Sequence, residues 1–232
     1  MLKLFAILVM TIDHADRVLL DAYFDYEFLT VIGRFAYPVF AFMIARNAMY
    51  TRNPRRYLML LVGFGALSQP IYWWALDHAS FWDPLNVMFT LALGVLSVRA
   101  WLAGPRFWPA LPFIIAAGHF VEYRMEGVAL MLAIAFTTYH LRERGWRHWH
   151  TLIGAASLIA LSFFLNISSY APGKVLHNPY GPWVVFALLI CFATLLPRVE
   201  QFETRFRWPG LRLFFYAYYP CHLAILGSLA LM

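Results

Sequence analysis

The stretch that decides the fold is residues 2–20, LKLFAILVMTIDHADRVLL. Its first half is almost continuously apolar, as expected of a helix that crosses a membrane. Its second half carries four ionisable residues, Asp13, His14, Asp16 and Arg17. Each ionisable side chain inside a bilayer costs roughly 2.5–3.5 kcal/mol on insertion scales, so such residues need partners and often mark a functional site.

Two interpretations of this cluster are open. Asp13 and Arg17 are one helical turn apart and can form an ion pair, which would make the cluster self-neutralised. Alternatively, His14, about 100° further round the helix than Asp13, faces a cavity or another helix and takes part in a reaction. We favour the second interpretation, because histidine is the side chain best able to transfer a proton near neutral pH.

The composition of the whole chain indicates a helical membrane protein. Of its 232 residues, 62% are hydrophobic and 13% are charged, whereas a soluble domain has about 45–50% apolar and 25% charged residues. Apolar runs recur along the chain and predict an all-α bundle of about nine transmembrane helices. They lie roughly at residues 2–20, 28–50, 57–76, 85–102, 107–120, 127–141, 151–165, 183–196 and 211–232. Short connections and the absence of an internal repeat predict a single domain over residues 1–232.

The charges are distributed unevenly between the connections. With a cytoplasmic N-terminus and alternating spans, most of the 18 Lys and Arg fall on the inner side and most acidic residues on the outer side, as the positive-inside rule requires. The net charge of +6 therefore reports orientation in a lipid bilayer and does not indicate a nucleic-acid partner. We expect Asp25, Lys174 and Met232 on the outer side.

Further polar residues gather near the predicted outer ends of the later segments. Arg34 follows Gly33 and can either neutralise Asp13 or Asp16 or bind an anionic group. Asn86, Thr90 and Gly94 recur every four residues, a stripe more typical of close helix packing than of catalysis.

The fifth and last segments add further candidates. Glu122, near His119 and Glu126, is placed either for acid–base chemistry or in an aqueous turn. Tyr219 and His222 interrupt an otherwise apolar segment, and His222 is deep enough to require a place facing the bundle interior. No histidine spacing typical of a metal site occurs within a predicted span, so no metal is expected.

Five short motifs occur in the order seen in the TraX family, which the chain resembles over almost its whole length. They are Ile12-Asp13-His14, Gly33-Arg34-x-Ala-x-Pro38, Ser68-Gln69-Pro70, Asn86-x-x-Phe-Thr90 and Tyr218-Tyr219-Pro220-x-His222. The resemblance implies a bacterial inner-membrane protein related to the transmembrane acyltransferases. In these a first-helix histidine works between cytoplasmic acetyl-CoA and an acceptor across the membrane. The acceptor does not carry over, and a protein N-terminus, a glycan or a small molecule are all open.

The resemblance gives the candidate residues roles in acyl transfer. His14 serves as base or nucleophile, and Asp13 orients or charges it. Arg34, Asn86 and Thr90 are candidate donors to a developing oxyanion. The remaining candidates around the acceptor are Glu122, Tyr219 and His222. Four inner-side arginines, Arg46, Arg52, Arg55 and Arg56, match the phosphates of coenzyme A, although the positive-inside rule alone makes such a loop basic.

Two other classes of function fit the same residues. A proton-coupled transporter or flippase also places Asp, His and Arg inside a bundle, and it predicts transport without consumption of acetyl-CoA. A non-enzymatic membrane assembly protein predicts that His14 and Arg34 tolerate substitution.

Overall fold

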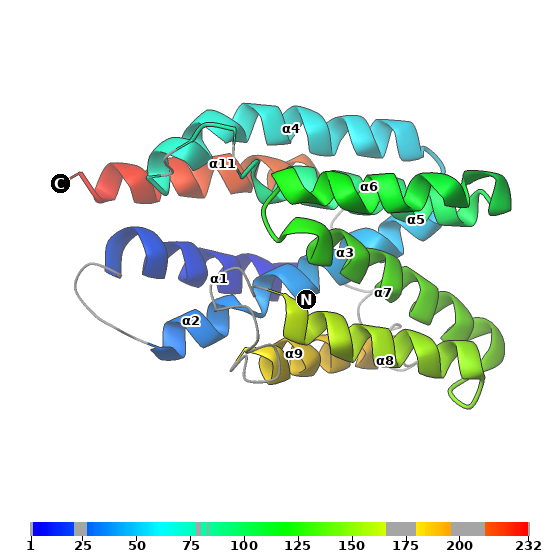
Figure 1. Ribbon diagram of the computed structural model, residues 1–232. Helices are drawn as coiled ribbons and strands as arrows, with labels where there is room; N and C mark the ends of the chain where they lie inside the picture. Colours follow the sequence, from blue (N-terminus) through cyan, green and yellow to red (C-terminus); the bar gives the residue numbers. More distant parts are fainter. Residues whose placement is uncertain are drawn as a thin grey trace.

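The computed structural model describes residues 2–20, 27–77, 80–82, 84–165, 180–195 and 212–231. These residues form helices joined by short connections, and the only β-type pairing among them is one isolated parallel bridge between Leu85 and Val121. The predicted all-α fold class is therefore confirmed for the part of the chain that the structure describes (Figure 1).

The helices follow the apolar segments of the sequence. In chain order they are α1 (Leu2–Ala15), α2 (Glu27–Gly33), α3 (Ala36–Tyr50), α4 (Pro54–Ala75), α5 (Val87–Leu102), α6 (Leu111–Ala117), α7 (Arg124–Arg144), α8 (Trp149–Phe164), α9 (Gly181–Ala193) and α11 (Arg212–Leu229). A π-helical turn, η1 (Asp16–Leu20), extends α1, and two 3-10 turns, η2 (Pro105–Ala110) and η3 (Gly118–Phe120), flank α6.

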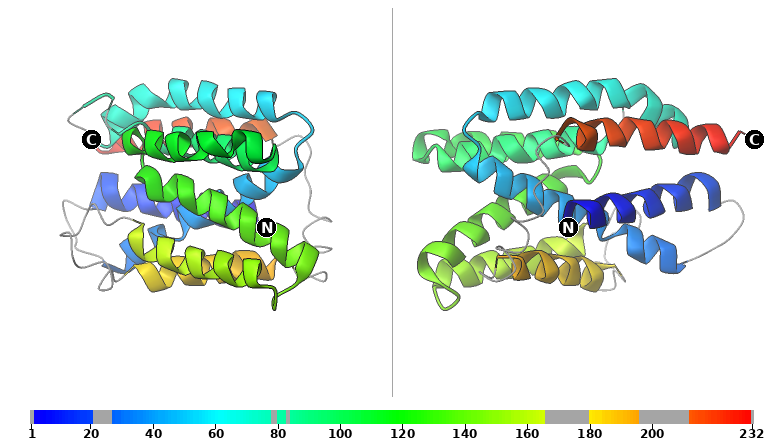
Figure 2. Two further views of the ribbon diagram at one scale, coloured as in Figure 1. Left: turned by 45° about the vertical axis from the view of Figure 1, so that its right-hand side comes forward. Right: turned by 180° about the vertical axis from the view of Figure 1, so that it is seen from behind.

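The bundle has a central group of helices covered on two sides. α4 and α11 lie together along the top of Figure 1, and α8 and α9 lie along the bottom. Between them α3, α5 and α7 contact one another and bury large side chains such as Tyr37, Phe42, Met131 and Ile134. Seen from behind, α1 runs beneath α11 (Figure 2), and this junction holds the polar residues of the first segment.

Two of the predicted spans are broken rather than continuous. The second divides at Arg34 and Phe35, whose amides donate to carbonyls three residues back, Val31 and Ile32, so the chain turns tightly between α2 and α3. The fifth contains Pro109 and Pro112 and follows Pro105, and prolines lack the amide donor that a regular helix needs. It consequently forms η2, the short α6 and η3.

The position of Pro70 within the third apolar segment predicts a break there, and that prediction is wrong. α4 continues through Pro70 to Ala75, because buried side chains on both sides of the proline, Ser68, Gln69 and Tyr72, pack into the bundle. The proline itself is on the exposed face.

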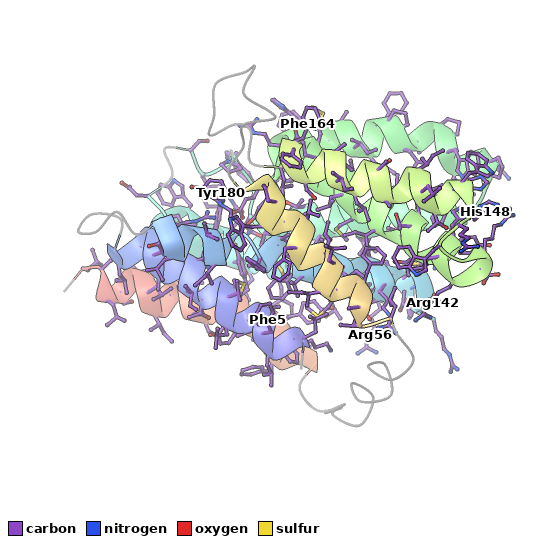
Figure 3. All side chains as sticks on the ribbon, turned by 90° about the horizontal axis from the view of Figure 1, so that it is seen from below. Phe5, Arg56, Arg142, His148, Phe164 and Tyr180 are labelled. Atoms are coloured by element: carbon purple, nitrogen blue, oxygen red, sulfur yellow. The ribbon has the colours of Figure 1, made fainter. Side chains whose placement is uncertain are left out.

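The predicted membrane spans are supported in part. Among the described helices, α4 alone is long and apolar enough to cross a membrane, while α5, α8, α9 and residues 213–229 are shorter apolar helices. The number of nine spans stays a prediction. Arg56, Arg142 and His148 lie toward one end of the bundle, away from Tyr180 and Phe164 (Figure 3). Asp25, Lys174 and Met232, which are predicted on the outer side, lie outside the described residues.

Candidate functional site

The candidate site lies where the end of α1 meets α11 and the turn before α7. Asp13, His14 and Asp16 are all buried there. The helix widens into the π-helical turn η1 directly after them, and π-turns inside helices often occur at functional sites.

The ring nitrogens of two histidines meet at the centre of the site. Nδ1 of His222 lies 2.8 Å from the carbonyl oxygen of Tyr218, and because a carbonyl only accepts, this nitrogen carries the proton. Nε2 of His222 is then an acceptor, and it lies 2.6 Å from Nδ1 of His14, which donates to it. The partners thereby assign the tautomers and leave Nε2 of His14 as an unprotonated acceptor.

A second hydrogen bond fixes the register between the same two helices. The hydroxyl of Thr11 donates to the carbonyl of Ile7 at 2.8 Å and accepts from the phenol of Tyr218 at 2.7 Å. The Tyr218 ring stacks on the His222 ring with centroids 5.1 Å apart. The His14–His222 pair is therefore held by both helices at neighbouring positions.

Asp13 is engaged with Arg17 and does not orient His14 as expected. Nη2 of Arg17 lies 2.9 Å from Oδ2 of Asp13, so the predicted one-turn ion pair is formed. A Cβ at Gly33 would lie 2.7 Å from Cγ of Asp13 and still closer to its Oδ1. The glycine of the Gly33-Arg34 motif thus makes room for the carboxylate. The partner that orients His14 is His222.

Glu122 reaches the same ion pair from the turn between η3 and α7. Its Oε1 lies 3.7 Å from Nη1 of Arg17. Burial raises the pKa of the Glu122 carboxyl, and the Arg17 guanidinium opposes that rise. The Glu122 amide donates to the carbonyl of Leu85 at 2.8 Å, and the Thr90 hydroxyl donates to the Glu122 carbonyl. These two hydrogen bonds therefore hold the turn against the start of α5.

The backbone beside Glu122 is strained. Tyr123 and Arg124 have φ values of 63° and 47°, a left-handed conformation that costs non-glycine residues about 1–3 kcal/mol. Such conformations persist where the surrounding contacts impose them, and they concentrate at functional sites. Here the strained turn places both Glu122 and Tyr123 at the wall of a cavity.

The cavity next to His14 has a volume of about 60 Å³, more than the 10–15 Å³ or so that one water needs. Its polar wall consists of Asp13, His14, Tyr37, Glu122, Tyr123 and Tyr219, and its apolar wall includes Met10, Phe40, Met88 and Leu91. The hydroxyls of Tyr37 and Tyr219 are buried without a hydrogen-bond partner among the described residues.

Asn86 and Thr90, expected as oxyanion donors, are instead used in holding the helices together. The Asn86 amide nitrogen donates to the Gly65 carbonyl and to Oε1 of Gln69, both at 2.8 Å, and its oxygen caps α5 at Met88. Thr90 donates to Glu122. Both side chains therefore position the wall of the cavity, and the packing interpretation of this stripe fits them better.

Arg34 is not the cation that neutralises Asp13, since within the described residues Arg17 does so. The Arg34 guanidinium lies 4.9 Å above the Tyr180 ring, and its Nε is buried without a hydrogen-bond partner in the described part of the chain.

The four predicted cofactor arginines lie around the α3–α4 connection. Arg52, Arg55 and Arg56 are exposed and Arg46 is half-buried. Tyr37 and Tyr50 stand near opposite ends of α3, a helix of 15 residues, so this connection is about 20 Å from the cavity. These arginines and His14 do not form one compact site.

A second histidine cluster, which the sequence did not single out, lies at the α7–α8 turn. The rings of His140 and His150 stack with centroids 4.5 Å apart, and those of His148 and His150 with centroids 4.9 Å apart. The pKa of His148 is lowered by burial and by the neighbouring Arg144 and His150. Because these three imidazole rings are nearly parallel, the lone pairs of their nitrogens lie in parallel planes and do not converge on one point. In keeping with this, the described residues contain no group of three His, Cys, Asp or Glu placed to hold a metal.

Tyr37 and Gln69 were not among the site residues predicted from the sequence, and Arg17 was given no role beyond the ion pair with Asp13. The sequence does contain a signal for each of the three. Tyr37 and Gln69 stand inside the Gly33-to-Pro38 and Ser68-Gln69-Pro70 motifs, and Arg17 stands one turn after Asp13.

Comparison with known proteins decides the family. The family described as TraX protein matches residues 1–230. The chain belongs to the TraX family. The relatives it matches include "Probable fimbrial assembly protein FimC, serogroup H1" of Dichelobacter nodosus, 28% identical over 98% of this chain and 93% of that protein. Protein TraX of Escherichia coli K12 is 29% identical over 99% of this chain and 86% of that protein. No solved structure matches the chain.

Proposed function

We propose that this TraX-family protein spans the bacterial inner membrane and serves the assembly of a surface filament by transferring an acetyl group. The role in assembly is supported by the relative named as a probable fimbrial assembly protein. The enzymatic role is supported above all by one observation: the Tyr218–His222–His14 hydrogen-bond chain leaves an unprotonated imidazole nitrogen on a residue that lines a cavity.

In the proposed reaction His14 acts as general base. An acceptor amine or hydroxyl attacks the thioester carbon of acetyl-CoA while Nε2 of His14 takes its proton. The charge that forms on the imidazole is shared with His222 through the 2.6 Å hydrogen bond. When the carbon–sulfur bond breaks, the departing thiolate takes the proton from Nε2, which restores the base and releases coenzyme A.

In this proposal the acyl donor, acetyl-CoA, has to extend across the helix bundle. Arg46, Arg52, Arg55 and Arg56 offer cations for its phosphates on the cytoplasmic side. The pantetheine arm then extends along the length of α3, about 20 Å, to the cavity at His14. The N-terminus lies in the cytoplasm, and the acceptor comes from the outer side.

A non-enzymatic assembly protein is the second candidate, and the relative's name favours it because that name states assembly and no reaction. The buried Asp13, Arg17 and Glu122 also fit a proton-coupled transporter. Of the three proposals, only the enzymatic one predicts that acetyl-CoA is consumed.

The deciding experiment uses the purified protein in lipid nanodiscs with acetyl-labelled acetyl-CoA and extracted envelope proteins, glycans or small molecules as acceptors. We expect release of coenzyme A together with transfer of label to one acceptor class. Absence of coenzyme A release with every acceptor class contradicts the enzymatic proposal. Filament assembly that survives His14→Gln in cells then supports the assembly protein.

A further inference from the structure

The two unpartnered phenols of the cavity are the largest unexplained polar feature of the described residues. Tyr37 on α3 is 2% exposed and Tyr219 on α11 is 3% exposed, yet neither hydroxyl has a hydrogen-bond partner there. A buried polar group without a partner destabilises the fold. Two such groups on the wall of one cavity, beside His14, indicate that a ligand satisfies them.

Ring packing, rather than hydrogen bonding, fixes the two phenols in place. Tyr37 stacks on Tyr123 with centroids 3.9 Å apart, and a Cβ at Gly127 would lie 2.7 Å from its hydroxyl oxygen. Tyr219 meets the His14 ring edge-on with centroids 6.0 Å apart. Their positions are therefore set before any ligand arrives, which is the condition for effective electrostatic stabilisation.

The remaining polar groups of the cavity narrow the choice of ligand. Asp13 and Glu122 face Arg17, and the Tyr123 ring stacks on Tyr37. The two hydroxyls without a partner and the acceptor nitrogen of His14 remain for the ligand. Two donors beside one base match a carbonyl group that is about to be attacked by an N–H or O–H nucleophile. They match a carboxylate less well, because a negative ligand would stand beside Asp13 and Glu122.

We propose that the hydroxyls of Tyr37 and Tyr219 bind the carbonyl oxygen of the acyl group and stabilise the oxyanion that forms from it. This inference rests on the proposed acyl transfer. As the acceptor adds to the acyl carbon, the carbonyl electron pair moves to oxygen, and both phenols donate hydrogen bonds without giving up their protons. The pair returns to the carbonyl when the thiolate leaves.

The test compares Tyr37→Phe and Tyr219→Phe with Tyr57→Phe, which removes a phenol hydroxyl outside this cavity. We expect each cavity variant to lower the acetyl-transfer kcat about 10²–10³-fold, as loss of one oxyanion donor does. We expect Tyr57→Phe to leave it unchanged. Without ligand, the cavity variants should melt at the wild-type temperature or above, because each loses only an unpartnered hydroxyl.

A binding measurement separates this role from a structural one. Acetonyl-CoA keeps the carbonyl but cannot transfer it, and S-propyl-CoA lacks the carbonyl. The thermal shift of the wild type should be larger with acetonyl-CoA, and both cavity variants should lose that difference. If the wild type transfers acetyl groups while both Phe variants match its kcat and its preference for acetonyl-CoA, this assignment alone is overturned. A wild type that transfers no acetyl group overturns the proposed function together with it.

Discussion

The two histidine clusters of the chain lie in contrasting surroundings. His14 and His222 are each 5% exposed, and a backbone carbonyl sets their tautomers. The cluster of His140, His148 and His150 lies at the far end of α7, a helix of 21 residues and so about 30 Å long. There the rings stack near exposed arginines, and Arg144 contacts Nε2 of His148 at 3.1 Å.

The difference shows which kind of histidine cluster indicates a functional site. The residues of the α7–α8 turn come together because they are close in sequence. His14 and His222 are 208 positions apart and meet in a buried place where two helices come together. Burying polar groups is costly unless they are satisfied, so such a meeting indicates a function more strongly than local clustering does.

The largest expected effect on stability compares two arginines. Arg17→Gln leaves the buried Asp13 and the half-buried Glu122 without their cation. Because the Arg17 side chain is itself 33% exposed, we expect a loss of about 2–3 kcal/mol in the free energy of unfolding. Arg142→Gln removes an exposed cation near Tyr50 and should cost less than about 1 kcal/mol. Denaturant unfolding in detergent measures both. Equal losses would show that the Arg17 ion pairs behave like surface contacts.

A smaller effect comes from the packing around Asp13. Gly33→Ala places a methyl group against the Asp13 carboxylate, and we expect overpacking to cost about 1–3 kcal/mol. Gly63→Ala in α4 is the matched control, because a Cβ there has no neighbour within 4 Å. It should be neutral or stabilise the helix by about 0.5–1 kcal/mol. Thermal melts of the two variants check the pair, and a neutral Gly33→Ala would mean that the site tolerates a shift of Asp13.

The smallest effect concerns pH and the histidine cluster at the α7–α8 turn. Because the pKa of His148 is lowered by burial and by Arg144 and His150, the folded protein binds fewer protons there than the unfolded chain does. Stability should therefore fall as the pH drops below the ordinary histidine pKa of about 6.5. The other titratable ring that faces His148 is that of His140. His148→Gln should flatten the dependence of the melting temperature on pH between pH 7.5 and 5, and an unchanged slope would assign it to other groups.

The sequence alone predicted the helices and one contact of the site, for reasons that are local. Continuous runs of apolar residues mark the helices. The Asp13–Arg17 pair follows from a spacing of four residues, which is about one helical turn. The division at Arg34 and the continuous α4 at Pro70 depend on packing between helices. The His14–His222 contact and the unpartnered hydroxyl of Tyr37 exist only once distant segments are placed together, so no spacing rule could predict them.

The central claim, that His14 is the base of an acyl transfer, is tested most directly by the rate of acetyl transfer of His14→Gln in nanodiscs. A glutamine can hydrogen-bond to His222 but cannot take a proton, and His150→Gln in the cluster at the α7–α8 turn is the matched control. We predict that His14→Gln folds with a melting temperature near that of the wild type and transfers acetyl groups about 10²–10⁴-fold more slowly, while His150→Gln keeps the wild-type rate. Near-normal transfer by a well-folded His14→Gln protein would contradict the account.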